Sequence, residues 1–240
     1  MTEEMQTLKE WIDGSDNIVF FGGAGVSTES GIPDFRSVDG LYSQKYQYPP
    51  ETIVSHTFLT KKTAEFFEFY KEKMVAPALK AAPNAAHRKL AQWEEEGKLK
   101  AVITQNIDGL HQAAGSKEVL ELHGTVMKNY CTRCGRKYDV NFVMKSEGVP
   151  MCECGGLVRP DVVLYEEGLD MDVMEKAVEY IRNADVLIIG GTSLVVYPAA
   201  GLIQYYRGNK LVLVNLSETA QDRHADLVIH DKIGQVFSQL

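Results

Sequence analysis

The stretch that decides the fold is residues 17–36, NIVFFGGAGVSTESGIPDFR. Residues 17–21 form an apolar run, rich in β-formers and short enough to be a buried strand. The glycines at 22, 23 and 25 let the backbone adopt positive φ angles and approach a ligand closely. Ser27 and Thr28 are good N-cap residues, so a helix is expected to begin here with unpaired N–H groups that suit a phosphate. A strand, a glycine turn and a helix start together predict the pyrophosphate site of a dinucleotide fold.

The glycine spacing alone leaves two interpretations open. It departs from G-x-G-x-x-G because Thr28 stands at the third glycine position, so an ordinary strand-to-helix turn fits as well as a ligand loop. Residues 31–36, GIPDFR, favour the ligand loop because they place an acid, an aromatic ring and a guanidinium directly after it. Phe35 can cover a flat cofactor ring, and Arg36 can pair with a phosphate or carboxylate through two hydrogen bonds. The alternative is a surface turn with one buried aromatic side chain.

Length and composition are those of a globular protein. The 240 residues suffice for one large α/β domain, with or without a small satellite, and 45% hydrophobic with 24% charged residues is ordinary. No apolar run approaches the length of a membrane span and the first ten residues are polar and acidic. We therefore expect no signal segment, no membrane anchor and a cytoplasmic location. The net charge of −8 argues against general affinity for nucleic-acid backbone and is compatible with basic partners.

Polar residues follow other predicted strands. The apolar run 101–104 predicts a buried strand, and three hydrogen-bonding side chains come directly after it: Gln105, Asn106 and Asp108. Ligands of open α/β sheets bind beyond the carboxyl ends of the strands, so these side chains are expected to contact one, although plain turn chemistry is the alternative. The short strand predicted over 119–122 ends at His123. A lone histidine is usually structural, but at a strand end it can face a cleft and act as a general base.

The remaining strand and helix patterns alternate. Residues 185–189 predict the strongest strand, which runs into a second glycine–serine turn at 190–193. Residues 210–214 predict a final strand that ends at Asn215. Helices are predicted over 1–12, 61–74, 83–96 and 171–182, and another from Pro198. This alternation predicts an α/β fold with a doubly wound, Rossmann-like parallel sheet.

The cysteines point to a metal. Their positions are Cys131, Cys134, Cys152 and Cys154. Two close pairs separated by seventeen residues form two knuckles that can meet around one tetrahedral zinc, and four thiolates leave no open position on it. We therefore expect one structural zinc, with a tighter second knuckle because that pair is C-x-C. Four unrelated buried thiols are the alternative.

We expect a larger domain and a smaller second domain that is helical and binds zinc. Residues 1–36, 83–123 and 160–240 are assigned to the Rossmann-like domain, which would bind the dinucleotide. Residues 37–82 are assigned to a helical and cofactor-loop insert, and residues 124–159 to a zinc-binding insert. The aromatic face of the helical insert is interpreted as core rather than as a binding surface.

The motifs together resemble those of the sirtuins, the NAD-dependent protein-lysine deacylases. The resemblance covers nearly the whole chain in the family's order. It rests on Gly23–Arg36, Thr104–Asp108, Leu122–Gly124, the cysteine pairs, Arg159–Val163, Gly191–Ser193 and Asn215–Leu216. It implies a bacterial-type deacetylase that uses NAD as co-substrate and acts on acylated lysine in proteins or peptides. A membrane or nucleic-acid partner is not expected.

The resemblance also implies a role for individual residues. The implied cofactor site comprises Gly23, Ala24, Gly25, Thr28, Asp34, Phe35, Arg36, Gln105, Asn106, Ile107, Asp108, His123, Gly191, Thr192, Ser193, Asn215, Leu216 and Ile233. Asp108 would read the nicotinamide carboxamide, and Phe35 would shield the reaction centre. The acyl oxygen of the substrate would attack the ribose carbon as nicotinamide leaves, giving an alkylamidate. His123 and Asn106 are the implied catalytic residues, with His123 as base on the ribose hydroxyls and Asn106 orienting the ribose and a water. The implied products are free lysine, nicotinamide and O-acyl-ADP-ribose.

The substrate peptide is implied to lie as an added strand between residues 163–165 and 194–196. The residues expected to contact it are Val163, Tyr165, Val196, Tyr70 and Lys73. Tyr70 and Lys73 stand where relatives that remove acidic acyl groups carry a Tyr and an Arg, although plain helix chemistry explains the pair equally well. Residues 165–167, YEE, replace the family's common Phe-Gly-Glu and put a carboxylate beside the peptide channel, which favours basic flanking residues.

Three other functions remain open at this point. A mono-ADP-ribosyltransferase or NAD glycohydrolase would use the same cleft, and a non-catalytic sensor would bind NAD or O-acyl-ADP-ribose without turnover. Asn106, Asp108 and His123 favour deacylation over both. A zinc-dependent hydrolase is the weakest hypothesis, because four thiolates leave no open metal position.

Overall fold

The computed structural model describes residues 2–34, 40 and 46–240. Six parallel strands form its main sheet in the order β3-β2-β1-β7-β8-β9. The strands are β1 Ile18–Gly22, β2 Leu99–Thr104, β3 Val119–Glu121, β7 Val186–Gly190, β8 Leu211–Val214 and β9 Leu227–Ile229. The strand order reverses between β1 and β7, and a reversal of this kind is where ligands bind in doubly wound sheets. The predicted fold class is confirmed.

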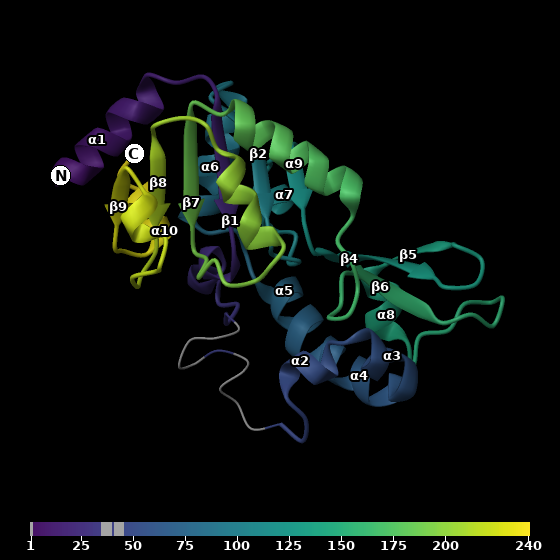
Figure 1. Cartoon of the computed structure of the whole chain (residues 1–240). Coiled ribbons are helices and arrows are strands. Elements are labelled where there is room, and N and C mark those ends of the chain that lie inside the picture. The colour runs from purple at the N-terminus through teal and green to yellow at the C-terminus, as the bar shows by residue number, and fades with distance from the viewer. Residues whose placement is uncertain (1, 35–39, 41–45) are drawn as a thin grey trace.

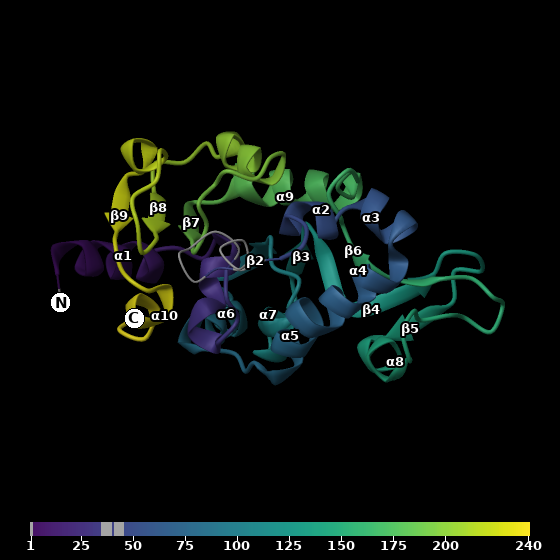
Figure 2. The same cartoon turned by 90° about the horizontal axis from the view of Figure 1, so that it is seen from below.

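Helices cover both faces of the sheet because successive strand residues point to opposite sides. Ile18 and Phe20 of β1 pack in one core, and Val19 and Phe21 pack in the other. The first face carries α1 Glu3–Asp13, α6 Ala85–Glu95 and α10 Ile233–Phe237, with the short α7 Leu110–Ala113 beside α6 (Figure 2). The second face carries α9 Met171–Asn183 and the 3₁₀ helix η5 Ala199–Tyr205.

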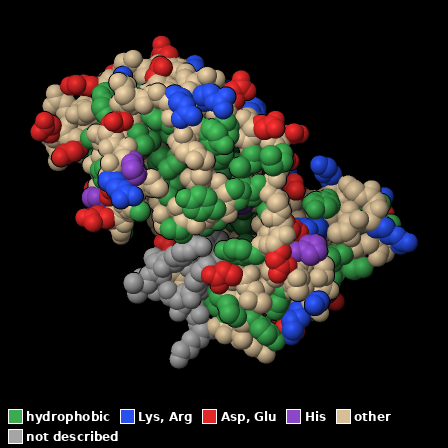
Figure 3. Space-filling model, in the orientation of Figure 1, with side chains coloured by type: hydrophobic (Ala, Val, Ile, Leu, Met, Phe, Trp, Pro, Cys, Tyr) green, Lys and Arg blue, Asp and Glu red, His purple; other side chains and the backbone are tan. Residues whose placement is uncertain are grey.

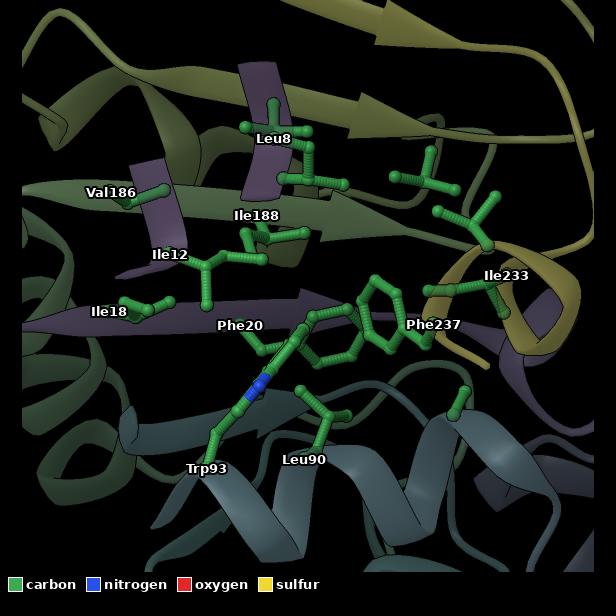
Figure 4. Close-up of a cluster of buried hydrophobic side chains, with 14 of the residues drawn as sticks. Leu8, Ile12, Ile18, Phe20, Leu90, Trp93, Val186, Ile188, Ile233 and Phe237 are labelled. Atoms are coloured by element: carbon green, nitrogen blue, oxygen red, sulfur yellow. The ribbon is translucent and has the colours of Figure 1, made fainter. Parts of the chain in front are cut away.

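The core on the first face joins the two ends of the chain to the sheet. Leu8 and Ile12 of α1 point toward the strands, and Phe237 of α10 lies against Trp93 of α6 (Figure 4). These side chains are at most 3% exposed. Fully burying one large apolar side chain stabilises the fold by about 1.5–3 kcal/mol, so this cluster holds α1 and α10 in place.

A smaller part of the molecule lies at one end of the sheet (Figure 1). Its helices are α2 Pro50–Ile53, α3 His56–Lys61, α4 Thr63–Phe69, the π-helical η4 Tyr70–Val75 and α5 Ala76–Lys80. Its antiparallel sheet has the order β5-β4-β6, with β4 Gly124–Cys131, β5 Lys137–Asp139, β6 Val158–Val162 and the helix α8 Val140–Lys145. The helices and this sheet share one core, in which Phe66, Phe67 and Tyr70 meet Val126 and Val158. The expectation that the aromatic face is core is confirmed.

Several predicted elements need correction. No regular helix follows Ser27 and Thr28: the chain makes two single 3₁₀ turns, η1 Ala24–Val26 and η2 Thr28–Ser30, and stops at Gly31 with φ 84°. The helix expected over 61–74 is divided into α3, α4 and η4, with a break at Lys62, whose φ of −133° is not helical. The helix expected from Pro198 is 3₁₀. Strand β9 and helix α10 were not predicted, because each is only three to five residues long.

Within the described residues, every helix is too short or too polar to cross a bilayer.

Candidate active site

A cavity of about 630 Å³ lies beyond the carboxyl ends of β1, β2, β7 and β8, where it faces the segment that follows β6. Its volume is within the range of about 300–1,000 Å³ typical of small-molecule sites. Most residues singled out from the sequence line it: Gly23, Ala24, Gly25, Asp34, Lys73, Gln105, Asn106, Ile107, Asp108, His123, Val163, Tyr165, Gly191, Thr192, Ser193, Val196, Asn215 and Leu216. On the face of the molecule that Figure 3 shows, hydrophobic side chains (green) gather near the middle, with acidic side chains (red) among them.

Five of the predicted site residues are not among those lining residues. The Thr28 hydroxyl donates to the carbonyl of Gly25. Tyr70 is fully buried in the core of the smaller part. Ile233, the first residue of α10, is buried in the core on the first face of the main sheet. Phe35 and Arg36 lie outside the residues that the structure describes.

The first glycine turn, at residues 22–25, packs against the second glycine turn, at residues 190–193. The Gly25 N–H donates to the carbonyl of Gly191 at 2.8 Å. Gly191 has φ 60°, and a Cβ on it would stand 2.4 Å from the backbone nitrogen of Val26. A side chain at Gly191 would therefore force the two turns apart, so glycine is required for this close approach.

Three polar side chains form a buried chain of hydrogen bonds beside these turns. The Ser27 hydroxyl donates to the Asp108 carboxylate at 2.6 Å and accepts from the Asn106 amide at 3.0 Å. The Leu110 N–H donates to the other Asp108 oxygen at 2.9 Å. Burial raises the pKa of Asp108, and the hydrogen bonds from Ser27 and Leu110 oppose that rise. Ser27 is thus a site residue that the sequence pattern assigned only to a helix cap.

His123 has a defined orientation. Its Nδ1 lies 3.0 Å from the Gln105 carbonyl oxygen. Because a carbonyl only accepts, Nδ1 must carry the proton, which leaves Nε2 unprotonated in the neutral ring. Burial lowers the pKa of His123, and the hydrogen bond to Gln105 opposes that shift. A neutral imidazole with one free nitrogen is the form that a general base requires.

The turn after β7 is tied to its neighbours through Thr192. The Thr192 hydroxyl accepts from the Gln105 amide at 3.0 Å, and the Thr192 N–H donates to Asn215 Oδ1 at 3.0 Å. Asn215 Nδ2 is buried and has no hydrogen-bond partner among the described residues. A buried donor without a partner is costly, so this amide is suited to an acceptor group of a bound ligand.

The segment after β6 forms one wall of the cavity. The Tyr165 N–H donates to the carbonyl of Val54, and the His56 N–H donates to the carbonyl of Tyr165. The Val163 N–H donates to the carbonyl of His123 at 3.0 Å. These bonds fix the wall to α3 and to His123, and they leave Tyr165 without a backbone group for an added strand.

An ion pair between Arg159 and Glu167 stabilises the segment after β6. Arg159 donates through two nitrogens to Glu167, at 2.6 and 3.0 Å, and Glu167 also accepts from the Leu164 N–H at 2.9 Å. His56 Nδ1 lies 2.8 Å from the same carboxylate. Partial burial pushes the pKa of Glu167 upward, but the hydrogen bonds from Arg159, Leu164 and His56 outweigh it and hold that pKa at about 2. Nothing in the local sequence pattern predicted this network.

The cysteines converge in the smaller part. All four sulfur atoms of Cys131, Cys134, Cys152 and Cys154 lie within 4.8 Å of one another. The Sγ–Sγ distance is 3.5 Å between Cys131 and Cys154 and 3.7 Å between Cys134 and Cys152. A tetrahedral zinc with Zn–S bonds of about 2.3 Å needs sulfur atoms roughly 3.8 Å apart. The shortened second pair therefore still fits a structural zinc.

The sequence model of the Sir2 family matches residues 23–198, which include both glycine turns, His123 and the four cysteines. The chain belongs to the Sir2 family. Two relatives named NAD-dependent protein deacetylase are each 60% identical to it. The one from Clostridium acetobutylicum matches 99% of this chain and 98% of its own length, and the one from Clostridium tetani matches 97% and 95%.

Solved Sir2 structures have the same fold. A Sir2 structure with a p53 peptide and NAD⁺ has 42% sequence identity and a TM-score of 0.88, covering 100% of this chain and 97% of that chain. A Sir2 structure bound to acetylated peptide has 41% identity and a TM-score of 0.87, again covering 100% and 97%.

Proposed function

We propose that this chain is an NAD-dependent protein-lysine deacylase that removes acetyl groups from lysine side chains and yields nicotinamide and O-acyl-ADP-ribose. The observation that carries the proposal is the cavity at the sheet's reversal point, where His123 Nε2, Asn106 and Asp108 meet the two glycine turns. Membership of a family whose relatives are named deacetylases supports it. An NAD glycohydrolase or a sensor would not need a base oriented as His123 is.

The cavity residues suit NAD. The close contact of Gly25 with Gly191 brings the two glycine turns together at the cavity, and the Asn215 amide, which has no partner among the described residues, offers a donor there. We assign the phosphates and adenosine half to Gly23–Gly25, Thr192, Ser193 and Asn215, and the nicotinamide end to Ile107 and Asp108. When bound, NAD supplies the ribose carbon that accepts the acyl oxygen as nicotinamide leaves.

The chain's own side chains hold the ligand groups in position and accept a proton. Asp108 is held by Ser27 and Leu110, so its carboxylate can receive a carboxamide N–H without reorientation. The Asn106 amide is held by Ser27 and keeps its oxygen for a ribose hydroxyl or a water. His123 accepts a proton at Nε2 while Nδ1 remains bonded to Gln105. Partial burial excludes bulk water from these groups, which strengthens each of their interactions.

We propose that the acyl-lysine peptide lies against residues 163–167, opposite residues 194–196. Val163, Tyr165 and Val196 line the cavity, and Lys73 and Met74 of η4 line its wall in the smaller part. Lys73 pairs with Glu72 at 2.8 Å. Tyr70 is enclosed in the core, so its hydroxyl is not part of this proposed substrate surface.

Product analysis by mass spectrometry tests the proposal. Purified protein, NAD and an acetylated lysine peptide should give free lysine and O-acetyl-ADP-ribose in equal amounts. We expect His123→Ala to lower the rate by about a hundredfold or more while NAD affinity changes little, since loss of a general base typically costs 10²–10⁴-fold.

Three results would contradict the proposal. NAD loss with ADP-ribosylated protein would indicate a transferase, and NAD binding without any product would indicate a sensor. Full turnover by the His123→Ala variant would exclude the assigned base. Thermal unfolding of that variant serves as the control for folding.

A further inference from the structure

Glu166 adopts a backbone conformation that its side chain does not favour. Its φ is 76°, in the left-handed region where glycine is preferred, and it directly follows the cavity wall formed by residues 163–165. Strain of this kind persists where surrounding contacts hold the residue and is concentrated at functional sites.

The Glu166 carboxylate is held at the cavity mouth by Thr57. Oε2 accepts from the Thr57 N–H at 2.9 Å, in the first turn of α3. The Thr57 side chain also interacts with this carboxylate, and Glu166 is solvent-exposed while lining the cavity. The hydrogen bonds from the Thr57 side chain and backbone hold the pKa of Glu166 below its usual value. The carboxylate is thus anchored to Thr57 and exposed to solvent at the cavity.

The backbone of Glu166 is also available to a peptide. Its N–H and C=O make no hydrogen bond to any residue that the structure describes, whereas both backbone groups of Tyr165 are paired, with Val54 and with His56. A peptide that adds to this wall as a strand would therefore pair with the backbone at Glu166. The residues next to its acyl-lysine would then pass beside the carboxylate.

The charges around the cavity make this carboxylate distinct. Glu167, its neighbour, is neutralised by the ion pair with Arg159, and Lys73 is paired with Glu72. Lys61 and His56 lie on α3 near Glu166, but neither makes an ion pair with it among the described residues. Glu166 is therefore an exposed carboxylate on the wall of the proposed peptide path that makes no ion pair among the described residues.

We propose that the Glu166 carboxylate selects protein substrates that carry a Lys or Arg side chain within two residues of the acyl-lysine. This inference rests on the proposed function, because it concerns the substrate of the same site. The occupant is a basic segment of another protein, and the acidic mouth suits it by charge.

The test compares acetyl-lysine peptides that differ only in an Arg, Gln or Glu flanking the acetyl-lysine. The wild-type protein should use the Arg peptide over the Glu peptide with a kcat/KM ratio of about three- to tenfold, carried by KM. Raising the salt from 50 mM to 500 mM should reduce this ratio, because exposed charges are screened.

Two variants separate the effect of the Glu166 charge from the effect of its backbone conformation. Glu166→Gln keeps an oxygen that can accept from Thr57 but removes the charge, so the ratio should fall to about one. Glu166→Gly removes the carboxylate and relieves the backbone strain, and it should give the same loss even if the Gln variant folds poorly. The matched control is Glu68→Gln, which removes an exposed charge on α4 away from the cavity and should keep the wild-type ratio.

Peptide affinity, measured by fluorescence anisotropy, tests the role of Glu166 separately from the proposed deacylase activity. Absence of product with every peptide would overturn the proposed function, while the Kd values would still report any charge preference. Equal Kd for the Arg and Glu peptides, or an unchanged preference in Glu166→Gln, would overturn the role of Glu166.

Discussion

At the scale of single residues, Ser27 links the two side chains that the proposed reaction needs in fixed positions. It is 1% exposed, donates to Asp108 and accepts from Asn106. Each of these bonds joins residues about eighty positions apart in the chain, so no local pattern contains it. A buried hydrogen bond to a charged group contributes about 1.5–3 kcal/mol, which makes Ser27 a residue of large effect.

Replacing Ser27 with Ala should therefore lower kcat/KM by about 10- to 100-fold, equivalent to roughly 1.4–2.8 kcal/mol. The Asp108 carboxylate would lose the hydrogen bond that opposes its burial, so its pKa should rise further. The acid limb of the pH–rate profile should then move to higher pH. Steady-state kinetics between pH 5 and 9 measure both effects. An activity loss with an unmoved acid limb would mean that Ser27 acts only through Asn106.

At the scale of elements, the packing of α6 on α7 buries two neutral histidines. The rings of His87 and His111 are 4.8 Å apart, and Phe20 of β1 lies 6.2 Å from His111. His87 Nδ1 accepts from the Asn84 N–H in the capping box of α6. Burial lowers the pKa of His87 to about 4, with Arg88 adding to the effect. Burial lowers the pKa of His111 to about 3, with His87 adding to it.

The buried pair of His87 and His111 predicts that the folded protein loses stability as the pH falls. Both folded-state pKa values lie below the usual 6.5, so the unfolded chain binds protons that the folded chain does not. The free energy of unfolding should hold its full value above about pH 6.5. It should fall by about 1.4 kcal/mol per pH unit for each histidine as the pH drops toward 4. His111→Leu, close in volume, should remove one such contribution. Urea unfolding from pH 4.5 to 8 measures the slopes, and parallel curves for wild type and variant would contradict the assignment.

At the scale of the whole molecule, the cavity lies between a large sheet and a smaller part with its own core. The core of the smaller part includes Cys131 and Cys152 as well as the aromatic side chains of α4 and η4. The same unit carries Lys73 and Val162 on the cavity wall. A zinc held by the four thiolates would therefore stabilise one wall of the site without entering the chemistry. This supports the proposal that the helical insert, over residues 46–82, and the zinc-binding insert act together as the smaller domain, with β6 extending the latter beyond residue 159 to Val162.

We expect one zinc per chain, and its removal should loosen the smaller part first. A chelator or Cys152→Ser should raise hydrogen exchange in β4, β5 and β6 while the six-stranded sheet stays protected, because only the smaller core contains the ligands. Peptide turnover should fall as this wall loosens. Elemental analysis and hydrogen-exchange mass spectrometry provide the measurements. Freshly purified protein without zinc, or uniform exchange across both sheets, would contradict this assignment.

The resemblance to the sirtuins supplied most of the predicted residues that line the cavity. The amino-acid sequence alone predicted five strands of the parallel sheet, the helices that became α1, α6 and α9, the doubly wound class and the cysteine cluster. Those features follow from local patterns, since apolar runs form buried strands and residues at their carboxyl ends must share one edge of a parallel sheet. Only the tertiary structure decided the bond from Ser27 to Asp108, the Arg159–Glu167 pair and the backbone groups left free at Glu166. It also showed that Tyr70 is enclosed in a core and that the chain after Ser27 turns without forming a helix. These features depend on which distant segments meet, and long-range contact is what local sequence pattern does not encode.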